Sequence, residues 1–263
     1  MTVGGIILLI IAVICFFVSR SSTKSLDAMN ATDTYTSQML TDLHQRVVST
    51  LGGDALAERC EIEGRIESDA PLKAPLTGTE CVAYTLTINR EYEEMVVNTD
   101  SQGNKTSNVS KGSETVENNE RRADFYVRDA TGRVLVRPDQ ATLDWKQTHE
   151  QFQPAAIAGT VLQFGDMKIT VPNISGPRRT LGYKAVEKVV ETGINVYILG
   201  CANDFNGQAA IGMDKRNDGR FVISRKTERE LAASAASSAK TWLYASGGFG
   251  VLGAILLVLG MVK

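Results

Sequence analysis

Two uncharged apolar segments at the ends of the chain limit what it can fold into. The first, VGGIILLIIAVICFFV, covers residues 3–18, and the second covers residues 242–262. A membrane-spanning helix needs about 20 apolar residues, so the first segment is near the short limit and the second has full length. Buried core helices are the alternative, but two of them at the two extreme termini would be unusual. The sequence therefore predicts transmembrane helices over 1–20 and 241–263.

The flanks of these segments favour anchors over a secretion signal. No basic residue precedes the first apolar segment, and Phe16, Phe17 and Val18 make a poor cleavage site, so an uncleaved anchor is predicted. Trp242 and Tyr244 stand at the entry of the second segment, where aromatic rings favour the headgroup level. Membrane lipid is thus the first predicted partner.

Basic residues concentrate between the two predicted spans. Only Lys263 lies on the other side, whereas the inner flanks carry Arg20, Lys24, Arg225, Lys226, Arg229 and Lys240. Cytoplasmic segments carry the excess of Lys and Arg. We therefore expect a cytoplasmic body with both termini outside.

The intervening chain has the composition of a folded domain without a nucleic-acid partner. Of the 263 residues, 43% are hydrophobic and 22% charged, which is typical of a globular protein. The net charge of −2 argues against nucleic-acid binding, which normally requires a basic face.

An amphipathic juxtamembrane helix is predicted over 21–53. Its apolar residues recur at steps of four and form one stripe that ends before Gly52 and Gly53. The stripe consists of Tyr35, Met39, Leu43, Val47 and Leu51. Such a face could pack on the body of the same chain or on a second copy.

The region 54–240 is predicted to be β-rich, which makes the fold class mainly β (α+β) between two transmembrane helices. CEIEGRIES and CVAYTLTINREYEE have the alternation and β-branched content of strands. The polar insert at about 94–122 is predicted as an exposed loop or a protruding hairpin tip. YKAVEKVVETG (183–193) is interpreted as a short helix ended by Gly193, and residues 226–240 as a helix leading into the second span.

Recognisable catalytic or metal-binding patterns are missing from the sequence. The histidines are His44 and His149, and the cysteines are Cys15, Cys60, Cys81 and Cys201. No paired spacing suits a zinc site, so the cysteines are interpreted as small buried residues and no metal or cofactor is expected. In an oxidising compartment Cys60 and Cys81 could pair.

The second predicted span carries small residues on one helix face. Ser246, Gly250 and Ala254 follow one another at steps of four, which allows close approach of another helix. That helix could belong to a second copy, which predicts self-association. The first span of the same chain is the alternative.

Several blocks resemble one membrane-protein family. They are ERCEIEGRIESDAPLKAPLTGTECVAYTLTINREYEE, SETVENNERRADFYVRDATGRVLVRP, TLGYKAVEKVVETGINVYILGCA and RFVISRKTERELAAS. In this order they resemble the GIDE domain, the region between the two spans of mitochondrial outer-membrane ubiquitin ligases. Similar two-span proteins occur in bacteria and archaea. The ligases carry a RING domain after the second span, whereas the sequence here ends at Lys263, so we expect a RING-less protein like the bacterial relatives.

The resemblance leaves three functions open. The first is a non-catalytic platform that binds a protein partner, copies of itself or a signal. The second is a ubiquitin-ligase-like protein, a ubiquitin transferase by kinship, that acts only with a separate RING or conjugating partner. The third is a hydrolase with unrecognised carboxylates, for which no catalytic residue can be named.

Overall fold

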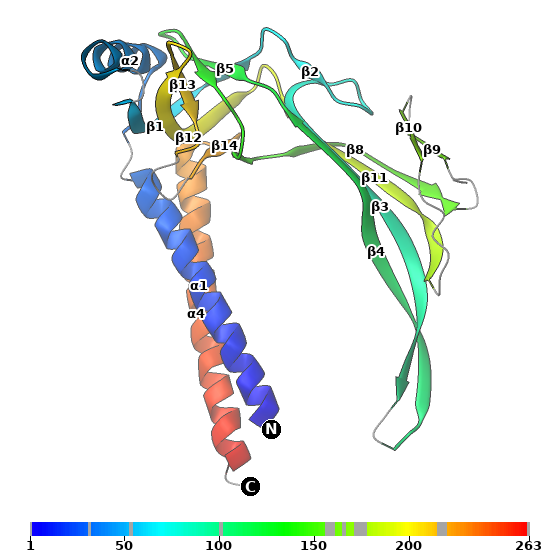
Figure 1. The fold of residues 1–263 in the computed structure, drawn as a ribbon. Helices are drawn as coiled ribbons and strands as arrows, with labels where there is room; N and C mark the ends of the chain where they lie inside the picture. Colours follow the sequence, from blue (N-terminus) through cyan, green and yellow to red (C-terminus); the bar gives the residue numbers. More distant parts are fainter. Residues whose placement is uncertain are drawn as a thin grey trace.

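The computed structural model describes residues 2–30, 33–52, 55–99, 102–155, 161–164, 167–170, 178–214 and 220–261. Figure 1 shows a β-rich body at one end of a long pair of helices, and both chain termini at the other end. The predicted fold class is confirmed. The elements are, in order, α1 (Thr2–Asn30), α2 (Ser37–Leu51), β1 (Ala57–Glu67), β2 (Leu72–Lys73), β3 (Glu80–Thr99), β4 (Lys105–Arg122), β5 (Phe125–Arg128), β6 (Arg133–Val136), β7 (Thr142–Leu143), β8 (Lys146–Pro154), β9 (Val161–Phe164), β10 (Met167–Thr170), β11 (Arg178–Glu191), β12 (Asn195–Phe205), β13 (Gln208–Gly212), β14 (Val222–Ser224) and α4 (Glu228–Met261).

The core of the body is a closed barrel of five strands. Its members pair in the ring β1-β5-β6-β13-β12, and β12 returns to β1. All neighbours are antiparallel except β6 and β13, which run parallel. If the five barrel strands are numbered 1 to 5 in chain order, their order around the ring is 1-2-3-5-4. This is the strand order of the OB-fold, a small five-stranded barrel. With α2, β7 and β14 this barrel forms the part that we call the head.

Apolar side chains of the barrel strands meet inside it. Ile62, Val127, Ile198 and Ile211 are fully buried, each on a different strand, and belong to one apolar cluster. Leu40 of α2 joins the same cluster, so α2 is packed onto the barrel rather than standing free. This burial provides the main apolar stabilisation of the head.

A second sheet, which we call the arm, is built from insertions between barrel strands. β2, β3 and β4 lie in sequence between β1 and β5, while β8 and β11 lie between β6 and β12. In the arm β3 pairs with β4 and β11, and β11 pairs with β8. The polar insert predicted at about 94–122 is therefore the distal part of a long hairpin, β3–β4, which extends away from the head (Figure 1).

The helix predicted over 183–193 is wrong, because these residues belong to β11. Tyr183, Ala185, Glu187 and Val189 are buried on one face of the strand, so the true period is two residues. Glu187 interrupted the apolar alternation in the sequence, and the remaining valines then matched a helical spacing.

The predicted juxtamembrane helix over 21–53 is divided in the structure. Residues 21–30 continue α1 beyond the apolar segment, and α2 begins only at Ser37. Between them the chain is held to β1, since the Tyr35 N–H donates to the Glu61 carbonyl over 2.8 Å. At the other end α4 begins at Glu228, two residues later than the predicted helix over 226–240, and continues into the second apolar segment as predicted.

Candidate functional site

The two terminal helices pack against each other in an antiparallel pair (Figure 1). Both are long and apolar enough to cross a membrane, with candidate spans over Val3–Ser21 and within Arg229–Gly260. Ser19 Oγ donates to the Ala239 carbonyl over 2.9 Å, which ties the two helices together near the head end of the first span.

Small residues bring the two helix backbones close at one face. A Cβ added to Gly253 would lie 3.1 Å from the Gly5 carbonyl oxygen, and one added to Gly5 would lie 2.9 Å from Cγ of Leu257. A Cβ on Gly250 would lie 4.0 Å from the Ala12 Cβ. Close packing through small residues is how membrane helices associate without a hydrophobic drive.

The small residues singled out in the second span do not all share this contact. Gly250 faces Ala12 of the same chain, Ser246 is half-buried and Ala254 is exposed. The contact face on α1 instead runs through Gly5, Ala12 and Ser19, which are spaced by seven and buried. Because residues seven apart lie on the same side of a helix, this spacing of small residues in the sequence could have indicated the face of α1 that contacts α4. Self-association through the second span stays a prediction.

The apolar stripe predicted before Gly52 is only partly covered within the chain. Tyr35, Leu43 and Val47 are half-buried, whereas Met39 is 49% exposed and Leu51 is 72% exposed. The residues that α2 buries most deeply are Ser37, Leu40 and His44. The stripe as a contact face for another copy therefore stays a prediction.

Polar contacts fix α2 to the head. Asp129, in the turn between β5 and β6, accepts the Ser37 N–H through Oδ2 over 2.6 Å, and Thr131 Oγ1 accepts the Gln38 N–H. Burial opposes the charge of Asp129, but hydrogen bonds from Ser37 and Thr131 outweigh it and lower the pKa of this carboxyl. Near the middle of the helix His44 Nε2 lies 2.6 Å from Asp204 Oδ1.

α2 leaves a hollow of about 590 Å³ between itself and the barrel. Its walls come from α2, from β5 and β6, and from the turn that begins β13. OB barrels use the face of their second and third strands, here β5 and β6, to bind extended ligands. In this chain α2 covers part of that face, so it is not a freely open surface.

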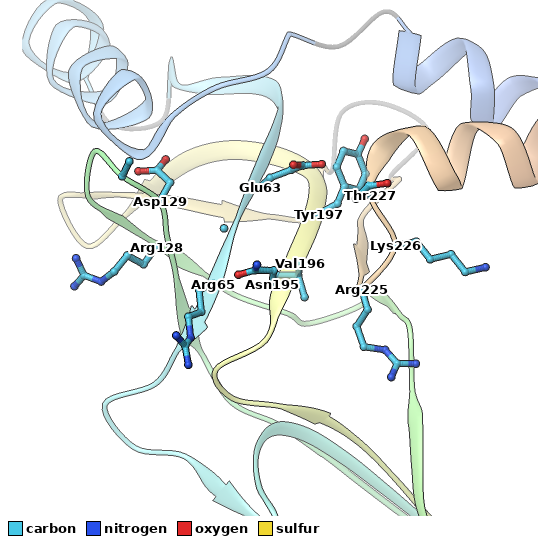
Figure 2. Close-up of a pocket in the computed structure, with 12 residues that line it drawn as sticks. Glu63, Arg65, Arg128, Asp129, Asn195, Val196, Tyr197, Arg225, Lys226 and Thr227 are labelled. Carbon is cyan, nitrogen blue, oxygen red and sulfur yellow. The ribbon is translucent and has the colours of Figure 1, made fainter.

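A second hollow, of about 440 Å³, opens where the head meets α4 (Figure 2). Its floor includes Gly64 of β1 and Val196 of β12, and the segment before α4 closes one side. Four cationic residues stand around it, and Figure 2 shows their side chains extending outward from the centre. We call this set the basic rim: Arg65, Arg128, Arg225 and Lys226.

The charges of the basic rim are only partly neutralised. Arg128 pairs with Glu67 over 2.6 Å, and Arg225 lies 3.4 Å from Asp144. Arg65 and Lys226 are exposed, and their side chains have no carboxylate partner within the part of the chain that the structure describes. The hollow thus presents the charges of Arg65 and Lys226 beside the predicted membrane entry, together with the carboxyl group of Glu63 in its lining.

The lining of this hollow offers several polar groups to a bound ligand. It includes the carboxyl groups of Glu63 and Asp129 and the hydroxyl groups of Tyr197 and Thr227. Asp129 already accepts hydrogen bonds from α2 and from its own turn, and the Thr227 hydroxyl donates to Glu230 over 3.2 Å. A few placed polar groups beside an apolar floor are typical of a binding pocket.

The cysteines lie elsewhere, buried and free. Cys60 and Cys81 thus do not form the disulfide considered from the sequence. Burial, with a contribution from Glu187, raises the pKa of Cys81 to about 11, and burial also raises the pKa of Cys60. A raised thiol pKa makes these groups poor nucleophiles. No group of three or more His, Cys, Asp or Glu side chains suited to a metal ion occurs over the described ranges.

Comparison with known proteins connects the fold to a family. A family model for GIDE, described as E3 ubiquitin ligase, matches residues 93–260, more than half of the chain. "E3 ubiquitin-protein ligase SP1" of Arabidopsis thaliana is 25% identical over 260 residues, which cover 97% of this chain and 68% of the relative. No solved structure matches with comparable significance. The matched region runs from the arm hairpin through the barrel into α4, and the chain therefore belongs to the GIDE family.

Proposed function

We propose that this protein is a membrane-anchored binding platform in which the basic rim holds an acidic segment of a protein partner. Family membership and the ligase relative support an E3-ligase-related role. The observation that carries the finer proposal is the hollow of about 440 Å³ with Arg65 and Lys226 unpaired at its edge.

The position of the hollow fits this role. Lys226 and Thr227 directly precede α4, so anything bound there is held where the head joins the membrane helix. Complementary charge steers an acidic chain into such a site and fixes its register. The exposed Asn195 and the buried Val196 then provide a polar and an apolar surface on the floor.

Charge reversal at the rim should strongly weaken this binding. The purified full chain in detergent is titrated into a fluorescent peptide of ten glutamates, and anisotropy is measured. The double variant Arg65→Glu, Lys226→Glu should weaken the complex by about tenfold or more, because attraction becomes repulsion at two positions. Lys73→Glu on β2 is the matched control and should bind like the parent. Equal affinity in all three proteins would contradict the proposal.

A ligase function that depends on a separate protein is the second candidate, favoured by the family match. Here the platform would present a bound substrate to a RING protein and its conjugating enzyme. An in vitro reaction distinguishes the binding platform from the ligase function. The protein is combined with activating enzyme, conjugating enzyme and ubiquitin, with and without an added RING domain. Ubiquitin chains that need both the RING domain and an intact basic rim would support the second candidate. Chains formed without the RING domain would contradict both.

We also propose that the head and arm face the cytoplasm, because six basic residues flank the predicted spans on that side and one on the other. Thr106, exposed in β4 of the arm hairpin, serves as the reporter position for this orientation. In a Cys15→Ala background, where the remaining cysteines are buried, Thr106→Cys should resist an impermeant maleimide in intact cells and react after lysis. Rapid labelling without lysis would place the body on the outer side.

A further inference from the structure

The distal part of the β3–β4 hairpin has two chemically different faces. Residues paired directly across an antiparallel hairpin have side chains on the same side. Thr99 pairs with Lys105, Val97 with Ser107, Met95 with Val109 and Glu93 with Lys111. These pairs alternate with Asn98–Thr106 and Val96–Asn108, whose side chains lie on the opposite side.

The first of these sides is apolar in the middle and basic at both ends. Met95, Val97 and Val109 are 71%, 53% and 62% exposed, so they are not part of the described core. Lys105 and Lys111 flank them and are exposed. We call these five residues the hairpin face. The nearby Glu93 is already paired with Arg179 over 2.7 Å, so the local balance of charge is positive.

The arm leaves this part of the hairpin uncovered. The pairing of β11 with β3 ends at Arg178 and Glu94, and beyond that point β3 pairs with β4 alone among the described strands. Arg90 fastens the hairpin at its base: it is 1% exposed and donates to Thr180 Oγ1 and Glu114 Oε1. The distal segment is thus held out from a fixed base.

The hairpin points in the same direction as the helix pair. Figure 1 shows it leaving the head on the side of the helices, with its tip near the level of the chain termini. At about 3.3 Å per residue, the 20 residues of β3 extend roughly 66 Å. At 1.5 Å per residue, the 34 residues of α4 extend roughly 51 Å, including the candidate span.

A bilayer around the helix pair cannot accommodate the hairpin in that position. β4 is a polar strand, KTSNVSKGSETVENNERR, and its outer edge is unpaired among the described strands. Hydrocarbon excludes open sheet edges, because their backbone groups would have no hydrogen-bond partner. Contact between the hairpin and the membrane surface therefore requires the head to turn relative to the helix pair. Such a turn would change the contact of Leu231 in α4 with Tyr197 and Leu199 of the head.

We infer that the hairpin face docks on an anionic membrane surface. The apolar centre enters the headgroup boundary, and the two lysines contact lipid phosphate or carboxylate groups, as in other interfacial anchors. The head then has a third attachment to the membrane besides its two helices, and the arm is held parallel to the bilayer.

Adjacent residues on opposite sides of β4 provide the test. The full chain with Cys15→Ala is placed in nanodiscs, one copy per disc, and carries an environment-sensitive dye at Ser107→Cys or at Thr106→Cys. Ser107 belongs to the side of the hairpin face and Thr106 to the polar side, and both are exposed. With anionic lipid, the dye at 107 should shift to the blue and be quenched by spin-labelled lipid, whereas the dye at 106 should respond much less.

Two double variants should weaken docking of the hairpin without changing the stability of the fold. Lys105→Glu with Lys111→Glu should lower the ratio of docked to free hairpins by about tenfold or more, since each lysine contributes about fivefold near an anionic surface. Met95→Ser with Val109→Ser should reduce the shift in every lipid. Thermal unfolding of both should match the parent, because all four residues are exposed.

Two outcomes would overturn the inference. Identical spectra at 106 and 107 that do not depend on lipid charge would show that the hairpin stays in water. A shift at 107 that appears only in discs with two copies would show that the hairpin face contacts a second copy of the chain.

Discussion

A cysteine pair at Ala12→Cys and Gly250→Cys should form a disulfide within one chain. The Cβ positions at these residues lie 4.0 Å apart, and disulfides need Cβ atoms about 3.5–4.5 Å apart. The background is Cys15→Ala, and the remaining cysteines are buried and should not react. Mild oxidation in native membranes should convert most molecules to an internally bridged monomer, detected by non-reducing mass analysis after proteolysis.

A bulky residue beside this pair should prevent the bridge. Gly253→Leu places a side chain against the Gly5 carbonyl and Leu9, and overpacking of this kind costs about 1–3 kcal/mol, up to about a hundredfold in the paired population. Gly248→Leu is the matched control, because a Cβ there meets nothing within 4 Å. Disulfides formed mainly between chains would show that the Gly250 face serves self-association instead.

Glu187→Val should be the most destabilising single change in the arm. Glu187 is fully buried and its carboxylate accepts from the Leu76 N–H over 2.6 Å, from the Thr77 hydroxyl and from the Thr148 hydroxyl. Valine removes the acceptor of the Leu76 N–H and one hydrogen bond of each threonine hydroxyl, at a cost of about 3 kcal/mol. We expect the melting temperature of the full chain in detergent to fall by about 6–12 °C.

Two comparisons identify the cause of that loss. Glu187→Gln should cost much less, because an amide oxygen can still accept from the backbone and the threonine hydroxyls can accept from its NH₂ group. Glu191→Val lies on the same strand but removes only a surface pair with Lys146, worth about 1 kcal/mol or less. Equal losses in all three variants would mean that strand packing, not the buried hydrogen bonds, determines stability.

The sequence predicts the outer architecture better than the connections within it. The apolar ends and the strand patterns around Cys60 and Cys81 predict a β-rich body between two helices, because hydrophobic periodicity is a local signal. Closure of the barrel, in contrast, depends on contacts between distant parts of the chain. Residues 57–65 pair with residues 195–203, which are more than 100 residues away. No short sequence pattern predicts such a pairing.

The candidate site was beyond sequence reasoning for a similar reason. Arg65, Arg128 and Arg225 come from three separate segments and surround one hollow only when the barrel closes. In the helix pair the sequence indicates a face of small residues on the second span, but which of these residues face α1 depends on the antiparallel register of α1 and α4. Gly250 faces Ala12, whereas Ala254, one turn further, is exposed.

Binding of a protein partner at the basic rim can be measured in native membranes with a photo-crosslinking amino acid at Asn195, on the floor of the hollow. We expect a defined protein adduct at Asn195 that is missing when the same group is placed at Lys73, and that disappears with Arg65→Glu and Lys226→Glu. Adducts at Asn195 that persist after charge reversal, or that equal those at Lys73, would contradict it.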